Sequence, residues 1–200
     1  NRRMVTNVRL QMSNLSEALV EKKDPKRALI ILDEILRGTP KQNVPYSRVI
    51  MPVAETYIKI SNSDTLKTDI AGILSEEEQA HALSTAKQLT EDLYTQAEET
   101  ISYSLSLAPE YFAATEEERQ LSLQVCDRLH RVLKYYHPED EFVAELASRN
   151  DSLEKNINDY QDVILGLSDM SGQPSEPKSQ NTKFTFCLLY TSPSPRDSIR

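Results

Sequence analysis

The sequence has no tryptophan, and only four glycines and two cysteines occur among its 200 residues. A loop that cradles phosphate through its backbone needs several glycines close together. The four glycines are instead scattered along the chain, at positions 38, 72, 166 and 172. Two cysteines leave no basis for a disulfide framework or a thiolate metal site. So few glycines also argue against a sheet protein with many tight turns.

Long apolar runs are absent too. No stretch approaches the roughly 20 apolar residues that are needed to cross a bilayer, and no basic-then-apolar signal segment opens the chain. We therefore expect these residues to be soluble and not to insert into a membrane. The chain starts at Asn1 rather than at a methionine, which suggests an interior piece of a longer protein.

Positive charge is also scarce relative to negative charge. Charged residues make up 27% of the sequence, and the formal net charge is -8. Proteins bind nucleic acids largely by neutralising phosphates with Lys and Arg, and anionic lipid surfaces attract basic segments. The acidic balance therefore disfavours nucleic acid and anionic membrane surfaces as partners.

What the sequence does contain is helical periodicity. Two amphipathic segments, 4–22 and 26–37, are separated by Asp24-Pro25 and followed by Gly38 and Pro40. Proline suits the first turn of a helix, and a glycine followed by proline suits its end. Apolar residues recur at steps of three and four, at Val5, Val8, Met12, Leu15 and Leu19 in the first segment and at Ala28, Leu29, Leu32, Ile35 and Leu36 in the second. The pattern predicts an antiparallel helical hairpin.

The spacing within this hairpin resembles a tetratricopeptide repeat, whose signature combines bulky, small and closing proline positions. Ser16 stands where glycine is usual and Ile35 where a small residue is usual, so the repeat is degenerate. The residues that carry the signature in this first unit are Leu15, Leu19, Ala28, Leu32 and Pro40.

A second, divided copy of the signature follows. Its first-helix half is Val53, Ala54 and Tyr57, and its second-helix half is Ala97, Ile101 and Pro109. More residues separate the two halves than a standard repeat permits, so we expect an insertion at about 61–92. Within that segment Ser75 and Glu78 form the pattern of a capping box, which predicts a long second helix over 76–107.

Two more helices are predicted after Pro109. In the first, over 116–136, Leu121, Val125, Leu129, Val132 and Tyr136 share a face. In the second, from Glu139, apolar residues at 143, 146, 153, 157, 160, 164 and 167 have heptad spacing, with Asn150 the one polar seam position. Both a coiled coil and a terminal helix that closes an α-solenoid produce this pattern. The closing helix is the favoured interpretation. We thus expect an all-α, tetratricopeptide-like domain over 1–167 and a disordered tail over 168–186.

Catalytic and metal-binding patterns are weak. Cys126 and His130 are four residues apart on a helix, but two ligands are too few for a structural zinc site. Glu116, Glu117 and Glu118 stand at a helix start, where they complement the helix dipole. Five tyrosines, at 94, 103, 111, 135 and 136, have no basic groove around them and are interpreted as helix-packing aromatics. We expect no catalytic residue, cofactor or metal in this fragment.

Three stretches carry a resemblance to a known family: NVPYSRVIMPVAETYIKI at 43–60, ISYSLSLAPEY at 101–111 and the following QLSLQVCDRL. They resemble, in order and spacing, the C-terminal soluble region of a bacterial family of large multi-spanning membrane proteins whose N-terminal halves look like protein O-mannosyltransferases of the GT-C type. Three motifs within these stretches match that family in order: Val44-Pro45-Tyr46, residues 52–57 and residues 103–111. The resemblance covers about 2–133. It implies a parent in the bacterial inner membrane with this region outside the bilayer. The acidic catalytic residues of that family lie in its membrane half, and none corresponds to a residue here.

The last stretch of the sequence differs in origin from the residues before it. CLLYTSPSPRD, at 187–197, back-translates to codons that match the adapter used in transposase-based sequencing libraries. We expect residues 187–200 to be translated adapter and the authentic protein to be readable to about Phe186.

Two functional hypotheses follow. The favoured one is a non-catalytic extramembrane module that binds a protein or peptide, or the membrane half of its own parent chain. The alternative is a free-standing tetratricopeptide scaffold that binds a peptide in its groove. A carboxylate-clamp type of peptide site is not expected, because Glu17 stands where such sites need asparagine.

Overall fold

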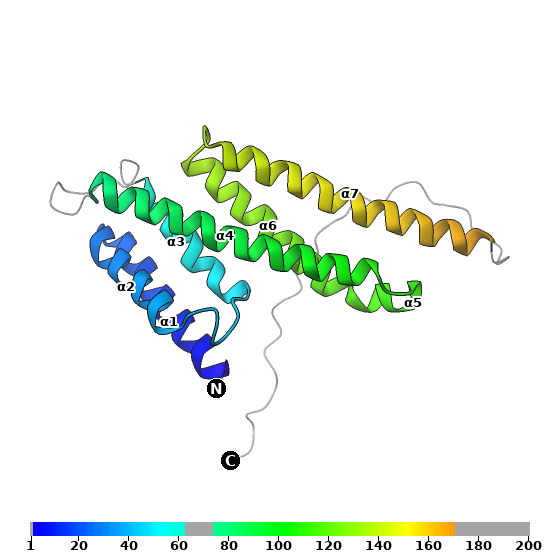
Figure 1. The fold of residues 1–200 in the computed structure, drawn as a ribbon, viewed down its shortest axis with the longest axis horizontal. Coiled ribbons are helices and arrows are strands. Elements are labelled where there is room, and N and C mark those ends of the chain that lie inside the picture. Colours follow the sequence, from blue (N-terminus) through cyan, green and yellow to red (C-terminus); the bar gives the residue numbers. More distant parts are fainter. Residues whose placement is uncertain (1, 63–73, 171–200) are drawn as a thin grey trace, which may run out of the picture.

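The computed structural model describes residues 2–62 and 74–170, with side chains described as far as residue 166. Within these ranges the chain is all-α (Figure 1). The elements are, in order, α1 (Arg2–Glu21), α2 (Pro25–Gly38), the 3₁₀ turn η1 (Arg48–Ile50), α3 (Met51–Ser61), α4 (Glu76–Leu105), α5 (Pro109–Phe112), the 3₁₀ turn η4 (Ala113–Thr115), α6 (Glu116–Tyr136) and α7 (Glu141–Met170).

The turn between the first two helices forms as its sequence predicts. Lys23 adopts a left-handed backbone with φ 59°, which reverses the chain after α1. The Asp24 side chain accepts a hydrogen bond from the backbone N–H of Arg27 at 3.2 Å, and Pro25 occupies the first turn of α2. A capping carboxylate satisfies one of the free N–H groups at a helix start, so Asp24 and Pro25 together fix where α2 begins.

The capping box at the start of α4 is confirmed. Ser75 Oγ accepts from Glu78 N–H at 3.2 Å, and Glu78 Oε2 accepts from Ser75 N–H at 2.7 Å. Glu76 and Glu77 add negative charge at the positive end of the helix dipole. The helix ends at Leu105, two residues before the predicted end, and Pro109 then begins α5.

The helices pack as successive hairpins. α1 packs on α2, α3 on α4 and α6 on α7. Each new hairpin also contacts both helices of the previous one: α3 contacts α1 and α2, and α6 contacts α3 and α4. Figure 1 shows α4 as a long central helix, with α1 and α2 below it, α7 above it, and α3 and α6 crossing it.

Seven of the eleven repeat-signature residues are buried, and they contribute to one continuous core. They are Ala28, Leu32, Val53, Ala54, Tyr57, Ala97 and Ile101. The apolar stripe predicted for α2 is confirmed, since Ala28, Leu29, Leu32 and Ile35 are buried and Leu36 is half-buried. Removing apolar surface from water at about 25 cal/mol per Å² stabilises this arrangement.

The apolar face predicted for α1 is only partly buried. Leu15 is 50% exposed and Val8 is 39% exposed, whereas the buried residues of α1 are Arg9, Ser13, Ser16 and Val20. The small serines allow close approach of neighbouring helices, and the Arg9 guanidinium is buried because backbone carbonyls surround it. Leu19 and Met12 are half-buried. Of the signature prolines, Pro40 is half-buried and Pro109 is exposed.

Part of the segment interpreted as an insertion contributes to the core. Residues 63–73 lie outside the described residues, but Leu74, Ala82, Ala86 and Leu89 are buried, the last three within α4. The two halves of the predicted second unit lie on helices of very different length, α3 and α4. α3 has 11 residues and α4 has 30, so at 1.5 Å per residue α3 spans only about a third of its partner. Ile101 and Leu153 line one hollow between α4 and α7.

The buried residues of α6 and α7 differ in detail from the apolar faces that the sequence predicts for these helices. In α6 the most buried apolar residues are Cys126, Leu129 and Leu133, while Leu121, Val125, Val132 and Tyr136 are half-buried at the sides. In α7 the seam positions Val143, Leu146, Leu153 and Ile157 are buried. α7 packs on α6 and α4. It continues through Met170, past the predicted start of the tail at 168, and Val163 and Leu165 near its end are exposed.

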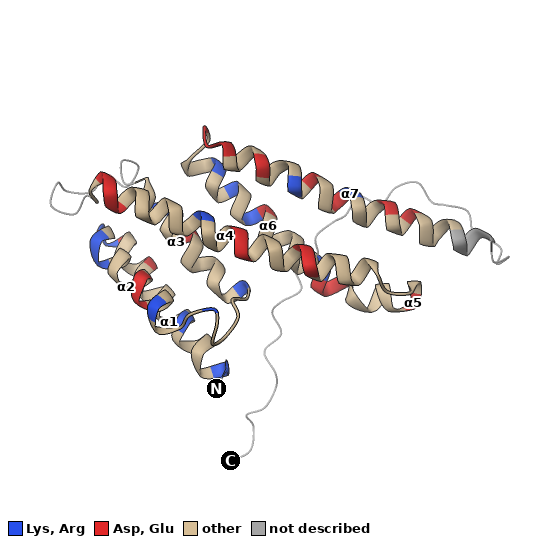
Figure 2. Cartoon of the chain, viewed as in Figure 1, with Lys and Arg blue, Asp and Glu red and all other residues tan. Residues whose placement is uncertain are grey.

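Both acidic and basic residues occur along the helices. Figure 2 shows acidic and basic segments interspersed along α1, α6 and α7, with an acidic start to α4. No helix in ranges 2–62 and 74–170 combines the length and the apolar character that spanning a membrane requires. The tail at 168–186 lies, apart from the end of α7, outside the described residues, as does the stretch at 187–200.

Candidate functional site

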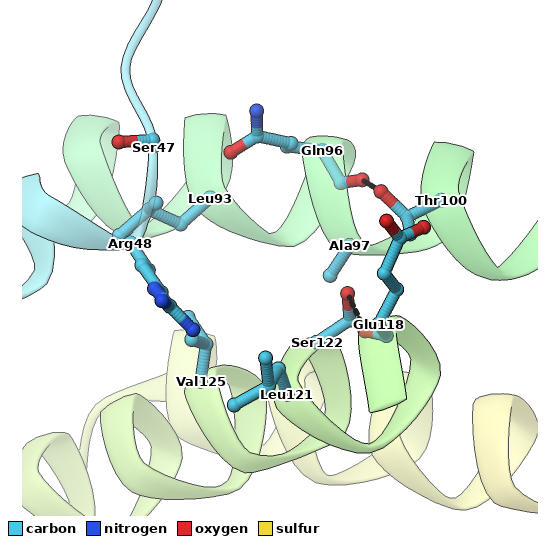
Figure 3. Close-up of a pocket in the computed structure, with 10 residues that line it drawn as sticks. All are labelled: Ser47, Arg48, Leu93, Gln96, Ala97, Thr100, Glu118, Leu121, Ser122 and Val125. Carbon is cyan, nitrogen blue, oxygen red and sulfur yellow. Dashed lines mark hydrogen bonds between the residues drawn. The ribbon is translucent and has the colours of Figure 1, made fainter. Parts of the chain in front are cut away.

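A hollow of about 380 Å³ lies between α4 and α6, beside the start of α3 (Figure 3). Its walls are the middle of α4 and the first half of α6, and residues of the loop and 3₁₀ turn before α3 lie at one end. We call it the α4–α6 hollow. Its lining residues come from three segments of the chain: Ser47 and Arg48; Leu93, Gln96, Ala97 and Thr100; and Glu118, Leu121, Ser122 and Val125.

The walls of the α4–α6 hollow are apolar where the helices approach each other. Leu93 and Ala97 are buried on α4, and Leu121 and Val125 are half-buried on α6. Ala97 contributes only a methyl group, which leaves space that a larger side chain at this position would fill. An apolar surface of this kind, with a few polar groups at its edge, is typical of a binding site.

The rim of the α4–α6 hollow is polar. Figure 3 shows Arg48 at one end and Glu118 at the other, with Gln96 on the α4 side. Thr100 Oγ1 donates to the Gln96 carbonyl and Ser122 Oγ to the Glu118 carbonyl, both at 2.9 Å, so these hydroxyls are used within their own helices. Within the described part of the chain, the side chains of Arg48, Gln96 and Glu118 have no hydrogen-bond or ion-pair partner.

The motif Val44-Pro45-Tyr46 is held by a residue that the sequence interpretation missed. Buried Arg9 donates to the carbonyls of Thr39 and Val44, at 2.7 Å each, and of Pro45 at 3.1 Å. Its guanidinium also lies 4.9 Å from the centre of the Tyr46 ring. Burial lowers the pKa of Arg9 from its ordinary value. Arg9 thus connects α1 to the loop that leads into η1 and the α4–α6 hollow.

Replacing Arg9 with methionine is expected to lower the free energy of unfolding by about 2 kcal/mol, because buried carbonyls lose their donor. Urea unfolding measures the change. Arg3→Met is the matched control, since Arg3 is exposed on the same helix, and it should shift stability by less than about 0.5 kcal/mol. Equal stabilities of the two variants would contradict the assigned role of Arg9.

The second motif, 52–57, places two polar groups in the core. Glu55 is buried and accepts two hydrogen bonds from Arg128 of α6, of which that from Nη2 is 2.9 Å long. The Tyr57 hydroxyl donates to Asp33 Oδ1 of α2 at 2.7 Å, and burial raises the pKa of Tyr57 above its ordinary range. These contacts connect α3 to the hairpins before and after it.

The third motif, 103–111, contacts a second buried arginine through Ser104. Arg119 of α6 donates to Ser104 Oγ at 2.7 Å and to the Phe112 carbonyl, and its guanidinium lies 3.5 Å from the centre of the Phe112 ring. The motif tyrosines Tyr103 and Tyr111 are exposed. Arg119 therefore fixes the turn between α4 and α6, and these two tyrosines do not pack in the core as expected.

The other tyrosines differ from one another. Tyr94 is buried and donates to the Cys126 carbonyl at 2.8 Å, as a packing aromatic does. Tyr136 is half-buried, and Tyr135 is exposed and contacts the edge of the Tyr136 ring. The packing interpretation thus holds for Tyr94 and in part for Tyr136.

The Cys126 and His130 pair does not form a reactive site. Cys126 is buried, and burial raises the pKa of its thiol to about 12, so the thiol stays protonated near neutral pH and is a poor nucleophile. Residues 2–62 and 74–170 contain no cluster of three side chains suited to hold a metal ion. Glu116 binds Arg119 and Gln120 at the start of α6, a structural role.

His137 connects the end of α6 to the end of α3. Ser61 Oγ donates to the Ile58 carbonyl, so His137 Nε2–H donates to Ser61 Oγ at 2.8 Å. Burial lowers the pKa of His137; Lys87 also lowers it, and Asp140 opposes the shift. For Asp140, burial alone would raise the pKa, but hydrogen bonds from Lys87 and the Phe142 N–H lower it, so Asp140 stays ionised at mildly acidic pH.

The lowered pKa of His137 predicts a loss of stability in mild acid. In the unfolded chain a histidine has a pKa of about 6.5. As pH falls below that value, the unfolded chain binds the proton first. The free energy of unfolding therefore falls until pH passes the lowered pKa of folded His137. Urea unfolding at pH 7.5 and pH 5.0 should show a larger loss for the native chain than for His137→Gln. A loss of equal size in both would contradict this assignment.

Comparison with known proteins identifies no relative: no family model, no curated protein and no solved structure matches this chain.

Proposed function

We propose that this chain is a non-catalytic helical-repeat module, similar in plan to tetratricopeptide arrays, that binds an extended segment of a partner protein in the α4–α6 hollow. The hollow carries the proposal: apolar walls lie between charged and amide side chains that no described residue pairs with. A concave, mostly apolar site with a few free polar groups is the usual form of a ligand site.

The repeat-like plan is supported by how the hairpins succeed one another. Each hairpin contacts both helices of the one before, which is the relation between neighbours in a solenoid. The small residues Ala28 and Ala54 are buried at signature positions. Such arrays commonly present a surface for peptide segments, and this one offers the hollow beside α3.

We further propose that the module belongs to a multi-spanning bacterial membrane protein similar to lipid-phosphate-sugar-dependent protein O-glycosyltransferases. The ordered motifs at 44–46, 52–57 and 103–111 support this, and their side-chain contacts suggest why a fold of this kind would keep them. Reading the gene upstream of Asn1 tests the proposal. Several apolar spans of about 20 residues are expected, and their absence would leave a free-standing scaffold as the better account.

Peptide selection tests the binding function. A library of random peptides displayed on phage is selected against the full chain, and the peptides recovered are measured by fluorescence anisotropy against Ala97→Phe, which fills the hollow. Binding to Ala97→Phe should be at least about tenfold weaker, the effect of losing a well-packed contact worth about 1.4 kcal/mol. Ala144→Phe, on the exposed side of α7, is the matched control and should bind as the native chain does.

Circular dichroism establishes that each variant is folded. Val125→Lys provides a second test if Ala97→Phe unfolds the chain, because it places a charge on the half-buried α6 wall of the hollow. Peptides that bind both hollow variants as tightly as the native chain, or a selection that recovers no binder, would refute the proposed function.

A further inference from the structure

In two other hollows of this structure, a basic lining residue is already paired with an acidic residue of the protein. Between α4 and α7, Arg149 already binds Glu91 at 2.6 Å and Glu98 at 2.8 Å. Beside the loop before η1, Lys41 binds Asp92 at 2.8 Å. A ligand that used those charges would have to displace a partner that the protein supplies itself.

Arg48 and Glu118 have no such internal partner among the described residues. Figure 3 shows them at opposite ends of the hollow, with the apolar side chains of Ala97, Leu121 and Val125 between them. A guanidinium presents a fork of N–H donors that suits a carboxylate, and a carboxylate accepts from an ammonium or guanidinium group. The two ends therefore differ in the charge they recognise.

We propose, on the basis of the binding function above, that the segment bound in the α4–α6 hollow carries an apolar residue between one acidic and one basic residue. The acidic side chain pairs with Arg48 and the basic side chain with Glu118. The apolar side chain lies against Ala97, Leu121 and Val125. A segment with two like charges leaves one end facing a repulsive charge, so the hollow discriminates by charge pattern as well as by apolar fit.

Because the two ends of the α4–α6 hollow carry opposite charges, reversing the charge at one end should change which peptides it prefers. Glu118→Lys makes both ends of the hollow basic, so it should prefer peptides with two acidic residues. Arg48→Glu makes both ends acidic, so it should prefer peptides with two basic residues. Both side chains are exposed, so both variants are expected to fold. Each exposed pair is worth about a fivefold change in Kd at low ionic strength, and salt should reduce the preference.

The test uses fluorescein-labelled peptides of four kinds, with one or two leucines between the flanking residues: Asp and Lys, two Asp, two Lys, and the uncharged Asn and Gln. Each is titrated against the native chain, Arg48→Glu, Glu118→Lys and the control Glu117→Lys, which changes a neighbouring exposed charge outside the hollow. The native chain and the control should prefer the Asp and Lys peptides. The two hollow variants should change their preference as described.

The outcomes separate this inference from the binding function. If the peptides recovered by phage selection bind in the hollow but charge reversal at Arg48 and Glu118 leaves every ranking unchanged, the charge rule is refuted and the binding function stands. If neither the selected nor the designed peptides bind, the function itself is refuted. If the native chain prefers peptides with two like charges, the assignment of the two ends is overturned.

Discussion

Replacement of Arg128 with methionine is expected to lower the free energy of unfolding by about 3 kcal/mol at neutral pH. Arg128 is more than half exposed, so little is lost by removing its own charge. The cost comes from Glu55, which is buried in α3 and would be left without its bidentate partner. Removing one partner of a buried pair leaves an uncompensated charge in the core.

The matched variants distinguish this cause from a general loss of packing. Glu55→Gln, which removes the charge and keeps the shape, should cost about 1 kcal/mol, the value of one net hydrogen bond. Arg128→Met combined with Glu55→Met should be more stable than Arg128→Met alone, because two apolar groups replace the pair. Urea unfolding of the three variants measures these differences. A double variant less stable than Arg128→Met would show that the pair is not the cause.

Truncation of Leu32 to alanine is expected to cost about 3 kcal/mol, whereas truncation of Leu15 should cost less than about 1 kcal/mol. Both residues hold positions of the predicted repeat signature. Leu32 is fully buried on α2, so its truncation leaves a cavity, but Leu15 is half exposed on α1. Thermal and urea unfolding of both variants measure the difference. Similar losses for the two would mean that Leu15 is covered in solution.

The contrast between Leu32 and Leu15 also shows what a sequence pattern can establish. Periodicity predicts that α1 is a helix and which residues share a face, and both hold. It cannot say which face is turned inward when the competing face has Ser13, Ser16 and Arg9. Burial of Arg9 depends on carbonyls of Thr39 and Val44, which come from another part of the chain. Local signals such as the Ser75 capping box needed no such information and were predicted correctly.

The α4–α6 hollow could not be predicted from the sequence. Its residues come from segments around Arg48, Ala97 and Leu121, which helix packing alone brings together. The long helix α4 was predicted from its capping box, but periodicity does not say which later helix packs against its middle. Cys126 and His130 illustrate the converse: their spacing is suggestive in the sequence, but burial of the thiol removes its reactivity.

Methyl-resolved NMR of the full chain with a selected peptide tests the binding site most directly. Leu93, Ala97, Leu121 and Val125 supply methyl groups to the α4–α6 hollow, whereas the exposed side chains of Met4, Val8 and Leu15 form a separate apolar stripe on α1. We predict that peptide addition shifts the methyl resonances of the hollow and leaves those of the α1 stripe in place. Shifts confined to the α1 stripe, with the hollow unchanged, would contradict the proposed function.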